Sequence, residues 1–289
     1  MTSQTTANQI QGTPPYLTFD GGRTRAVDAN GLLGITLSDG TKYTPSTNTS
    51  SSTTPISLPV VGQSFADISM FVPTDTNSVA LSSLIGPPNN YWGDDDGDSG
   101  VSATGSLSLS IVDKNNQVVS RNSVLTICNS PYKVTLSSTN GTLSTRYGFP
   151  NRSTFNASNV TYYVNPKVEP VVCFVRPGSL SSWLENSPSM WDSSNGFFTQ
   201  ETDPSRYAQN FPTTGGNGLY FDLLINGVSQ PLSWSPVSLG GITVTMSNPT
   251  ATSVRVTLTG PYATQSQINS SSPIPISKPT LPQTFELVG

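Results

Sequence analysis

Residues 105–120 read GSLSLSIVDKNNQVVS, and this stretch gives the clearest signal of the fold. The apolar residues of its first half alternate with serine, at positions Leu107, Leu109 and Ile111. This two-residue period is typical of a β-strand with one buried face. Residues 113–116 are polar turn formers, and the apolar pattern resumes at Val118. The stretch therefore predicts a β-hairpin whose turn lies at residues 113–116.

Short apolar or alternating runs recur on both sides of this hairpin and predict many further strands. They lie at residues 16–20, 31–40, 56–61, 66–72, 124–128, 133–138, 161–164, 171–175, 218–229, 231–234, 240–247, 253–260 and 284–289. Helical periodicity is confined to residues 178–191, GSLSSWLENSPSMW. We therefore predict an all-β protein made of immunoglobulin-like antiparallel β-sandwich domains in tandem.

A change in the pattern along the chain predicts two domains. Residues 176–212 are rich in proline and serine and have no regular apolar period, so we place the domain boundary near Gly178. The first predicted domain, residues 1–178, is a β-sandwich with long loops. The second, residues 179–289, has a length that suits a single immunoglobulin-like β-sandwich.

Several polar segments predict loops and turns. Residues 44–55, TPSTNTSSSTTP, predict a flexible surface loop. Asn140-Gly141 and Asn226-Gly227 are dipeptides typical of tight turns. Two small acidic groups, residues 20–22 and 28–31, predict turns rather than ligand sets.

Composition excludes several classes of function. The 289-residue chain contains no histidine, which excludes Ser-His-Asp and Cys-His nucleophiles. Only 10% of its residues are charged and its net charge is −4, so it lacks the basic surface that binds nucleic acid. No apolar run approaches the roughly 20 residues that span a bilayer, so we expect no membrane insertion by this segment. These features favour a non-enzymatic extracellular β-protein.

The two cysteines, Cys128 and Cys173, both lie in or beside apolar runs that we expect to form strands. In an oxidising compartment a disulfide between them is predicted. The alternative is a pair of buried free thiols, which pack well as small apolar groups. A bridge between these positions would stabilise the fold by about 4 kcal/mol in the chain-entropy model.

Residues 91–100, YWGDDDGDSG, carry a dense group of carboxylates. Asp94, Asp96 and Asp98 follow the alternate spacing of calcium-binding loops. An EF-hand is excluded because its glycine and glutamate positions hold Ser99 and Gly105. Three interpretations stay open: a simple Ca²⁺ site, a solvated acidic turn, and a glycosidase-type acid/base pair.

The same loop contains three glycines, Gly93, Gly97 and Gly100, and we expect it to be flexible. Ordering a flexible loop costs backbone entropy, so the sequence predicts weak Ca²⁺ binding, with millimolar affinity at most. Asp95 and Ser99 lie off the alternating face and are expected to be dispensable to any site, whereas Asp96 is expected to be essential to it. We expect no cofactor apart from this ion.

Aromatic residues supply the remaining candidates for a binding surface. Trp234, at a strand end, is predicted to lie in a core. Trp183 and Trp191 lie in the irregular segment and either seal a domain interface or form a patch for a receptor or glycan. Tyr91 and Trp92, beside the aspartates, either stack on a sugar or hold the loop in place.

Residues 211–235, FPTTGGNGLYFDLLINGVSQPLSWS, resemble the immunoglobulin-like modules of the intimin/invasin family of bacterial surface adhesins. In those modules a Phe-Pro-Thr-Thr-Gly run precedes a strand that ends near a Trp-Ser pair, here Trp234-Ser235. NGLLGITLSDGTKYTP, LIGPPNNYWGDDDGDSG, YKVTLSSTNGTLS and LPQTFELVG are similar to the adhesion region of its invasin-E-like branch. The order of these motifs along the chain is a stronger signal than any one of them.

This resemblance implies an adhesin segment that is displayed on a Gram-negative outer membrane or secreted. It implies a host cell-surface protein or glycan as partner, and we expect a monomer. The family's membrane barrel and its capping lectin-type module have no counterpart in the sequence. The alternatives are a secreted carbohydrate-binding or carbohydrate-active protein that uses the aspartate-rich loop, and a viral capsid or fibre protein.

Overall fold

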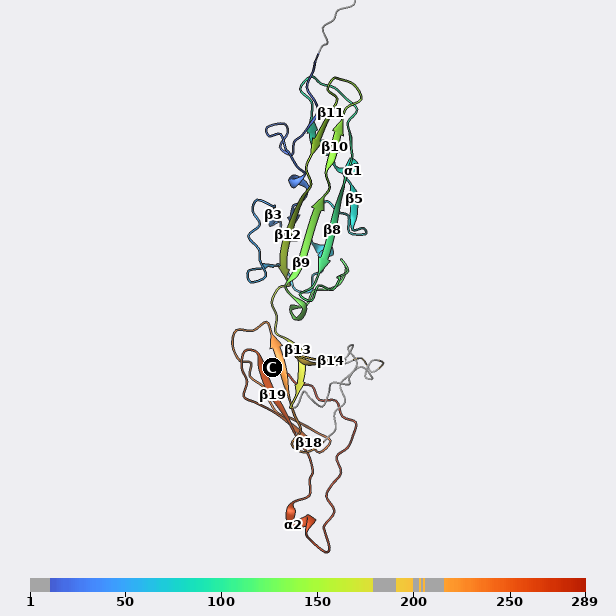
Figure 1. Ribbon diagram of the computed structural model, residues 1–289. Coiled ribbons are helices and arrows are strands. Elements are labelled where there is room, and N and C mark those ends of the chain that lie inside the picture. The colour runs from blue at the N-terminus through green and yellow to red at the C-terminus, as the bar shows by residue number, and fades with distance from the viewer. Residues whose placement is uncertain (1–10, 179–190, 200–202, 204, 206–215) are drawn as a thin grey trace, which may run out of the picture. The chain divides into compact units, whose positions relative to one another are not determined.

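The computed structural model describes residues 11–178, 191–199, 203, 205 and 216–289 (Figure 1). Of the described residues, 34% lie in β-structure and 7% in helices, and among them the strand pairs are antiparallel apart from one parallel pair. The predicted all-β antiparallel class is therefore confirmed. The predicted helix-permissive segment, residues 178–191, lies almost wholly outside the described residues.

The chain divides into two compact units, Met1–Lys167 and Val168–Gly289. This division falls earlier than the predicted boundary near Gly178. The reason is β13 (Val171–Pro177), which lies within the first predicted domain. β13 pairs with β15 (Gly196–Phe198) and β16 (Tyr220–Asn226), so it is an interior strand of the second unit's sheet.

The first unit contains one main sheet and three small ones. The main sheet has five strands, in the order β4 (Ile56–Ser57), β12 (Ser158–Asn165), β9 (Tyr132–Ser138), β8 (Ser106–Val112) and β5 (Ser78–Ala80). A three-stranded sheet has the order β11 (Arg152–Phe155), β10 (Gly141–Ser144) and β7 (Ser102–Ala103). The pairs are β1 (Tyr16–Leu17) with β6 (Trp92–Gly93), and β2 (Ile35–Thr36) with β3 (Lys42–Tyr43). Its helices are α1 (Ser82–Ile85), η1 (Asn30–Leu32), η2 (Phe65–Asp67) and η3 (Ile127–Asn129).

The second unit has a single sheet among its described residues. Its seven strands have the order β14 (Trp191–Asp192), β15, β13, β16, β19 (Ser253–Thr259), β18 (Ile242–Ser247) and β17 (Val237–Leu239). A short helix, α2 (Gln265–Ile268), follows β19. An immunoglobulin-like sandwich has two separate sheets, so the predicted tandem immunoglobulin-like arrangement is not confirmed.

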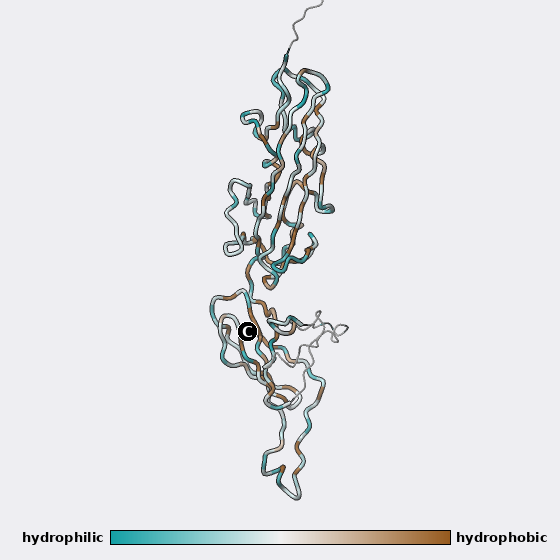
Figure 2. Tube along the Cα trace, viewed as in Figure 1, coloured by the Kyte–Doolittle hydropathy of each residue, from teal (hydrophilic) through white to brown (hydrophobic). Residues whose placement is uncertain are grey.

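Burial in the main sheet follows the two-residue period read from the sequence. On β8, Leu107, Leu109 and Ile111 are buried while the intervening serines are exposed. The register places Leu109 opposite Leu136 of β9, and Leu136 opposite Val160 of β12, so apolar side chains share one face. Figure 2 shows the same alternation of polar and apolar residues along the chain.

The predicted turn after β8 is confirmed. The Asp113 carboxylate Oδ1 accepts hydrogen bonds from the amides of Asn115, at 2.8 Å, and Gln117, at 3.0 Å. Asn116 has φ of 60°, the left-handed conformation that asparagine tolerates. The returning arm is shorter than predicted, because only one isolated bridge, Val112 to Val118, continues the pairing.

Asn140-Gly141 is not a hairpin turn. The strands on either side of it, β9 and β10, belong to different sheets and do not pair with each other. A Cβ atom on Gly141 would lie 2.1 Å from the Phe155 ring and 2.5 Å from the Thr104 carbonyl oxygen. Glycine is required here for the close approach of neighbouring groups rather than for a turn.

Residues 44–55 are not the free surface loop that their composition predicts. The Asn48 side chain donates to the Thr161 carbonyl of β12 at 2.8 Å, and the Tyr163 amide donates to Ser50 Oγ at 3.0 Å. Ser50 in turn donates to Asn48 Oδ1 at 2.6 Å. The segment therefore satisfies backbone groups along the edge of β12 that β4 does not reach, which protects this edge from other strands.

Cys128, in η3, and Cys173, in β13, are joined in a disulfide, so the alternative of two free thiols is wrong. Cys173 Sγ also accepts a hydrogen bond from the Asn226 side-chain amide at 3.4 Å.

Arg121 is a buried cation that organises the segment of residues 65–73. The residue is only 6% exposed, and its guanidinium donates to the carbonyls of Val72 and Pro73, both at 2.7 Å. It also donates to the carbonyls of Ile68, at 3.4 Å, and Phe65, at 3.5 Å. Burial lowers the pKa of this arginine, because the charged form is removed from water.

We predict that Arg121→Met lowers the free energy of unfolding by about 3 kcal/mol, because it leaves buried carbonyls without a donor. Arg121→Lys is expected to recover only part of this loss, since an ammonium lacks the planar fork that reaches several carbonyls. Urea unfolding followed by circular dichroism measures both effects. Arg23→Met, at an exposed arginine of the same unit, is the control, and an equal loss in this variant would contradict the prediction.

Candidate functional site

The candidate site is built around residues 94–100, which we call the Asp loop. The loop leaves β6, which pairs with β1, and it leads into β7. Gly97 and Gly100 have φ of 81° and 76°, so the two sharpest bends of the loop fall on residues without a Cβ. Two short strands therefore fix both ends of the loop.

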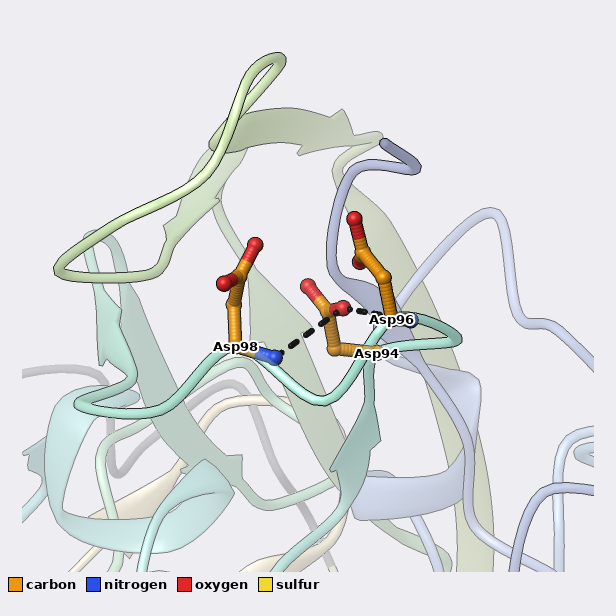
Figure 3. A group of neighbouring side chains, drawn as sticks. All are labelled: Asp94, Asp96 and Asp98. Atoms are coloured by element: carbon orange, nitrogen blue, oxygen red, sulfur yellow. Dashed lines mark hydrogen bonds between the residues drawn. The ribbon is translucent and has the colours of Figure 1, made fainter. Parts of the chain in front are cut away.

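Asp94, Asp96 and Asp98 are brought together as their spacing predicts. Each offers an oxygen atom, and these atoms lie within 4.8 Å of one another. Figure 3 shows the three side chains rising from the same side of the loop. Asp94 Oδ1 accepts hydrogen bonds from the amides of Asp96, at 3.1 Å, and Asp98, at 3.4 Å, so this carboxylate also shapes the loop.

The charges of the three aspartates are only partly compensated. Asp94 Oδ2 and Asp98 Oδ2 are buried and lack a hydrogen-bond partner among the described residues. Burial, reinforced by the neighbouring Asp96, raises the pKa of Asp94. The hydrogen bond with Asp94 and those from Thr13 lower the pKa of Asp96. Such a group can hold a hard divalent cation or share a proton between two carboxylates.

Other segments hold the Asp loop in place, contrary to the expectation of a flexible loop. Asp95 forms an ion pair with Arg25, whose guanidinium lies 4.3 Å from the centre of the Tyr16 ring. Asp96 accepts from the amide and hydroxyl of Thr13, at 3.2 and 3.3 Å. The Ser99 carbonyl accepts from the Arg146 amide at 2.9 Å. Much of the entropy of ordering this loop is therefore lost on folding rather than on ligand binding.

Two glycines allow the chain to approach the carboxylates closely. A Cβ atom on Gly12 would lie 1.7 Å from Asp96 Oδ2, and one on Gly148 would lie 2.0 Å from Asp98 Oδ2. Gly148 also has φ of 102°. The sequence pattern does not predict a role in the site for either glycine, or for Thr13, Arg25 and Arg146. No local signal could reveal them, because Thr13 and Asp96 are 83 positions apart.

Tyr91 and Trp92 anchor the loop and pack against the first unit's core. The Tyr91 ring lies 5.3 Å from the ring of Phe19 and 6.0 Å from that of Phe71, measured between centroids. Trp92 is half-buried against the same core, and its strand partner is Leu17. Of the two roles left open for these aromatics, the structure therefore favours holding the loop in place over stacking on a sugar.

The other tryptophans are also positioned by packing where the structure describes them. Trp191 is buried in the second unit's core, edge-on to Phe197 with ring centroids 4.7 Å apart, so it offers no patch for a receptor. Trp234 packs against the same core, which confirms its predicted place. Trp183 lies outside the described residues.

The two smaller acidic groups are turns, as predicted. Asp20 Oδ1 accepts from the Thr24 amide and the Thr18 hydroxyl, both at 2.9 Å. The hydrogen bonds from Thr24, and then that from Thr18, lower the pKa of Asp20 to about 2. Asp28 accepts from the Asn30 amide at 3.0 Å, at the start of η1.

Comparison of the chain with protein-family models, curated proteins and solved structures finds no match. The resemblance to the intimin/invasin family therefore rests on the sequence motifs alone. In the described part of the chain, no helix has the length and apolar character needed to cross a membrane.

We predict that Ca²⁺ raises the melting temperature through the Asp loop. At ten times the dissociation constant, a ligand that binds only the folded state stabilises it by about 1.4 kcal/mol, or a few degrees. Asp96→Asn should abolish this rise, because it removes one charge of the triad and retains an oxygen that can accept from Thr13. Asp95→Asn, at the aspartate paired with Arg25, should preserve the rise.

These variants are compared by differential scanning calorimetry over a tenfold range of Ca²⁺ around the millimolar level. A melting temperature that does not change over this range would leave the solvated acidic turn as the correct interpretation.

We also predict that Asp20 contributes to the acid stability of the first unit. Its folded pKa of about 2 lies below the ordinary value of 3.8, so the ionised form stabilises the fold above that value. This contribution is lost as the pH falls from 3.8 towards 2. The wild-type advantage over Asp20→Asn, measured by urea unfolding, should therefore shrink over this window. A difference that stays constant through the window would show that the turn does not depend on the charge.

Proposed function

We propose that the chain is a non-enzymatic, extracellular segment of a bacterial surface adhesin. It attaches to host cells or extends a more distal binding tip. The observation that carries this proposal is the surface beside the Asp loop. Tyr147 and Phe149 are 62% and 58% exposed there, on a loop that is hydrogen-bonded at both ends. Exposed aromatic side chains on an ordered loop favour recognition of a partner.

The disulfide supports an extracellular location. Disulfides form and persist in oxidising compartments such as the periplasm and the cell surface. The bond between Cys128 and Cys173 fits a segment that crosses the periplasm and is then displayed on the outer membrane or secreted. The ordered motifs that resemble the intimin/invasin family point to the same location.

A carbohydrate-active enzyme is the second candidate. It draws support from Asp94 and Asp96, whose pKa values are shifted in opposite directions, as in an acid/base pair. A screen of soluble glycans for hydrolysis tests this candidate. Turnover that is lost in Asp94→Asn would establish an enzyme and contradict the proposed adhesin.

The adhesin proposal is tested by attachment. The purified chain, labelled with a fluorophore, should bind cultured epithelial cells saturably, and excess unlabelled chain should displace it. An albumin labelled to the same extent is the control for non-specific binding. Attachment no greater than that of albumin, together with cooperative self-assembly on size-exclusion chromatography, would favour a capsid or fibre protein instead.

A further inference from the structure

The most exposed aromatic surface in the described part of the first unit is the turn between β10 and β11. We call residues 145–151 the aromatic loop. It carries Tyr147 and Phe149, which are 62% and 58% exposed. Large aromatic rings left in water forgo the stabilisation that burial would give them. Two of them on one short turn therefore mark a contact surface rather than a part of the core.

The aromatic loop is ordered by its own hydrogen bonds. The Thr145 amide donates to the Asn151 carbonyl at 2.9 Å, and the Asn151 side chain donates to the Thr145 carbonyl at 3.2 Å. The Thr145 hydroxyl donates to the Tyr147 carbonyl at 2.9 Å. The rings are thus presented on a backbone that is set before any partner binds, which reduces the entropy lost on binding.

The aromatic loop and the Asp loop form one continuous surface. The Arg146 amide donates to the Ser99 carbonyl at 2.9 Å, and Gly148 packs directly on the Asp98 carboxylate. The Phe149 carbonyl accepts from the Gly12 amide at 2.7 Å, and Gly12 in turn packs on Asp96. The two loops therefore lie side by side, with the exposed Asp96 on one of them and the exposed rings of Tyr147 and Phe149 on the other.

We propose that this surface binds a neutral glycan through one or two sugar rings, an inference that rests on the proposed adhesin function. The apolar C–H face of a pyranose packs on the Tyr147 and Phe149 rings. Its hydroxyls donate to the exposed Asp96 carboxylate and accept from the Arg146 guanidinium, which lies 5.5 Å from the centre of the Tyr147 ring. Hydroxyl groups both donate and accept, which suits this mixture of acidic and basic neighbours.

The chemistry of the surface selects this partner over others. The Asp loop carries four aspartates, of which Asp95 pairs with Arg25, and Arg146 is the one cation of the aromatic loop, so the formal charge of the two loops with Arg25 is negative and disfavours an acidic sugar. Two exposed rings offer far less apolar area than the roughly 800 Å² that each partner contributes to a typical protein interface. A basic protein surface is the other partner that this negative surface would attract. The experiment below distinguishes it from a neutral glycan.

The test is an array of neutral hexose and N-acetylhexosamine oligosaccharides printed beside their sialylated counterparts. We expect the chain to bind neutral glycans, and Tyr147→Ala and Phe149→Ala each to weaken that binding about tenfold. Tyr262→Ala is the matched control, because Tyr262 is 59% exposed and belongs to the second unit. Sialylated counterparts should bind several-fold more weakly than the neutral glycans.

Three results would overturn the inference. They are the absence of binding to any neutral glycan, binding that survives both substitutions in the aromatic loop, and equal binding of sialylated glycans. The same variants are then tested for attachment to epithelial cells. If attachment depends on Tyr147 and Phe149 while no glycan binds, the partner is a protein. If attachment is unchanged in both variants, the adhesin proposal stands and only the glycan site fails.

Discussion

The first unit depends on the burial of one face of its five-stranded sheet. Leu109, Leu136 and Val160 lie in register across β8, β9 and β12, and a slip of one residue would move this whole row into water. β10 follows β9 in the chain and pairs with β7. The register of β9 in the main sheet therefore also determines where β10 meets β7. The Asp loop ends at β7 and the aromatic loop begins after β10. The core of the sheet therefore brings the two loops together, although their residues are far apart in the sequence.

Features that depend on neighbouring residues could be predicted from the sequence. The period along β8 and the turn at Asp113 are examples, because a strand's alternation and an aspartate that accepts from nearby amides are local properties. Features that depend on distant pairing could not be predicted in this way. The dipeptide Asn140-Gly141 is typical of a hairpin turn. Position 141 nevertheless requires glycine for another reason, because the Phe155 ring packs against it. β13 was assigned to the wrong unit for the same reason, since its partners follow it in the chain.

The candidate site shows the same division between local and distant information. The spacing of Asp94, Asp96 and Asp98 predicts their convergence, because all three lie on one short loop. The exposure of an aromatic residue is decided by what packs on it. Tyr91 is covered by Phe19 and Phe71, whereas Phe149 stays exposed although its carbonyl is bonded to Gly12. Nothing near Tyr147 or Phe149 in the sequence distinguishes them from aromatics of a core.

The Asp loop holds like charges close together, and the structure shows how this is possible. Asp95 turns to Arg25, and Asp96 is stabilised by Thr13, so two of the four carboxylates have partners from other segments. In the described part of the chain, Asp94 has no such partner from another segment. Burial and the neighbouring Asp96 raise its pKa, which means that ionising this carboxyl is unfavourable there. Neutral glycine backbone, at Gly12 and Gly148, packs on the carboxylates where a side chain would not fit. Residual repulsion within an otherwise ordered loop means that a ligand which neutralises or shares this charge stabilises the folded first unit.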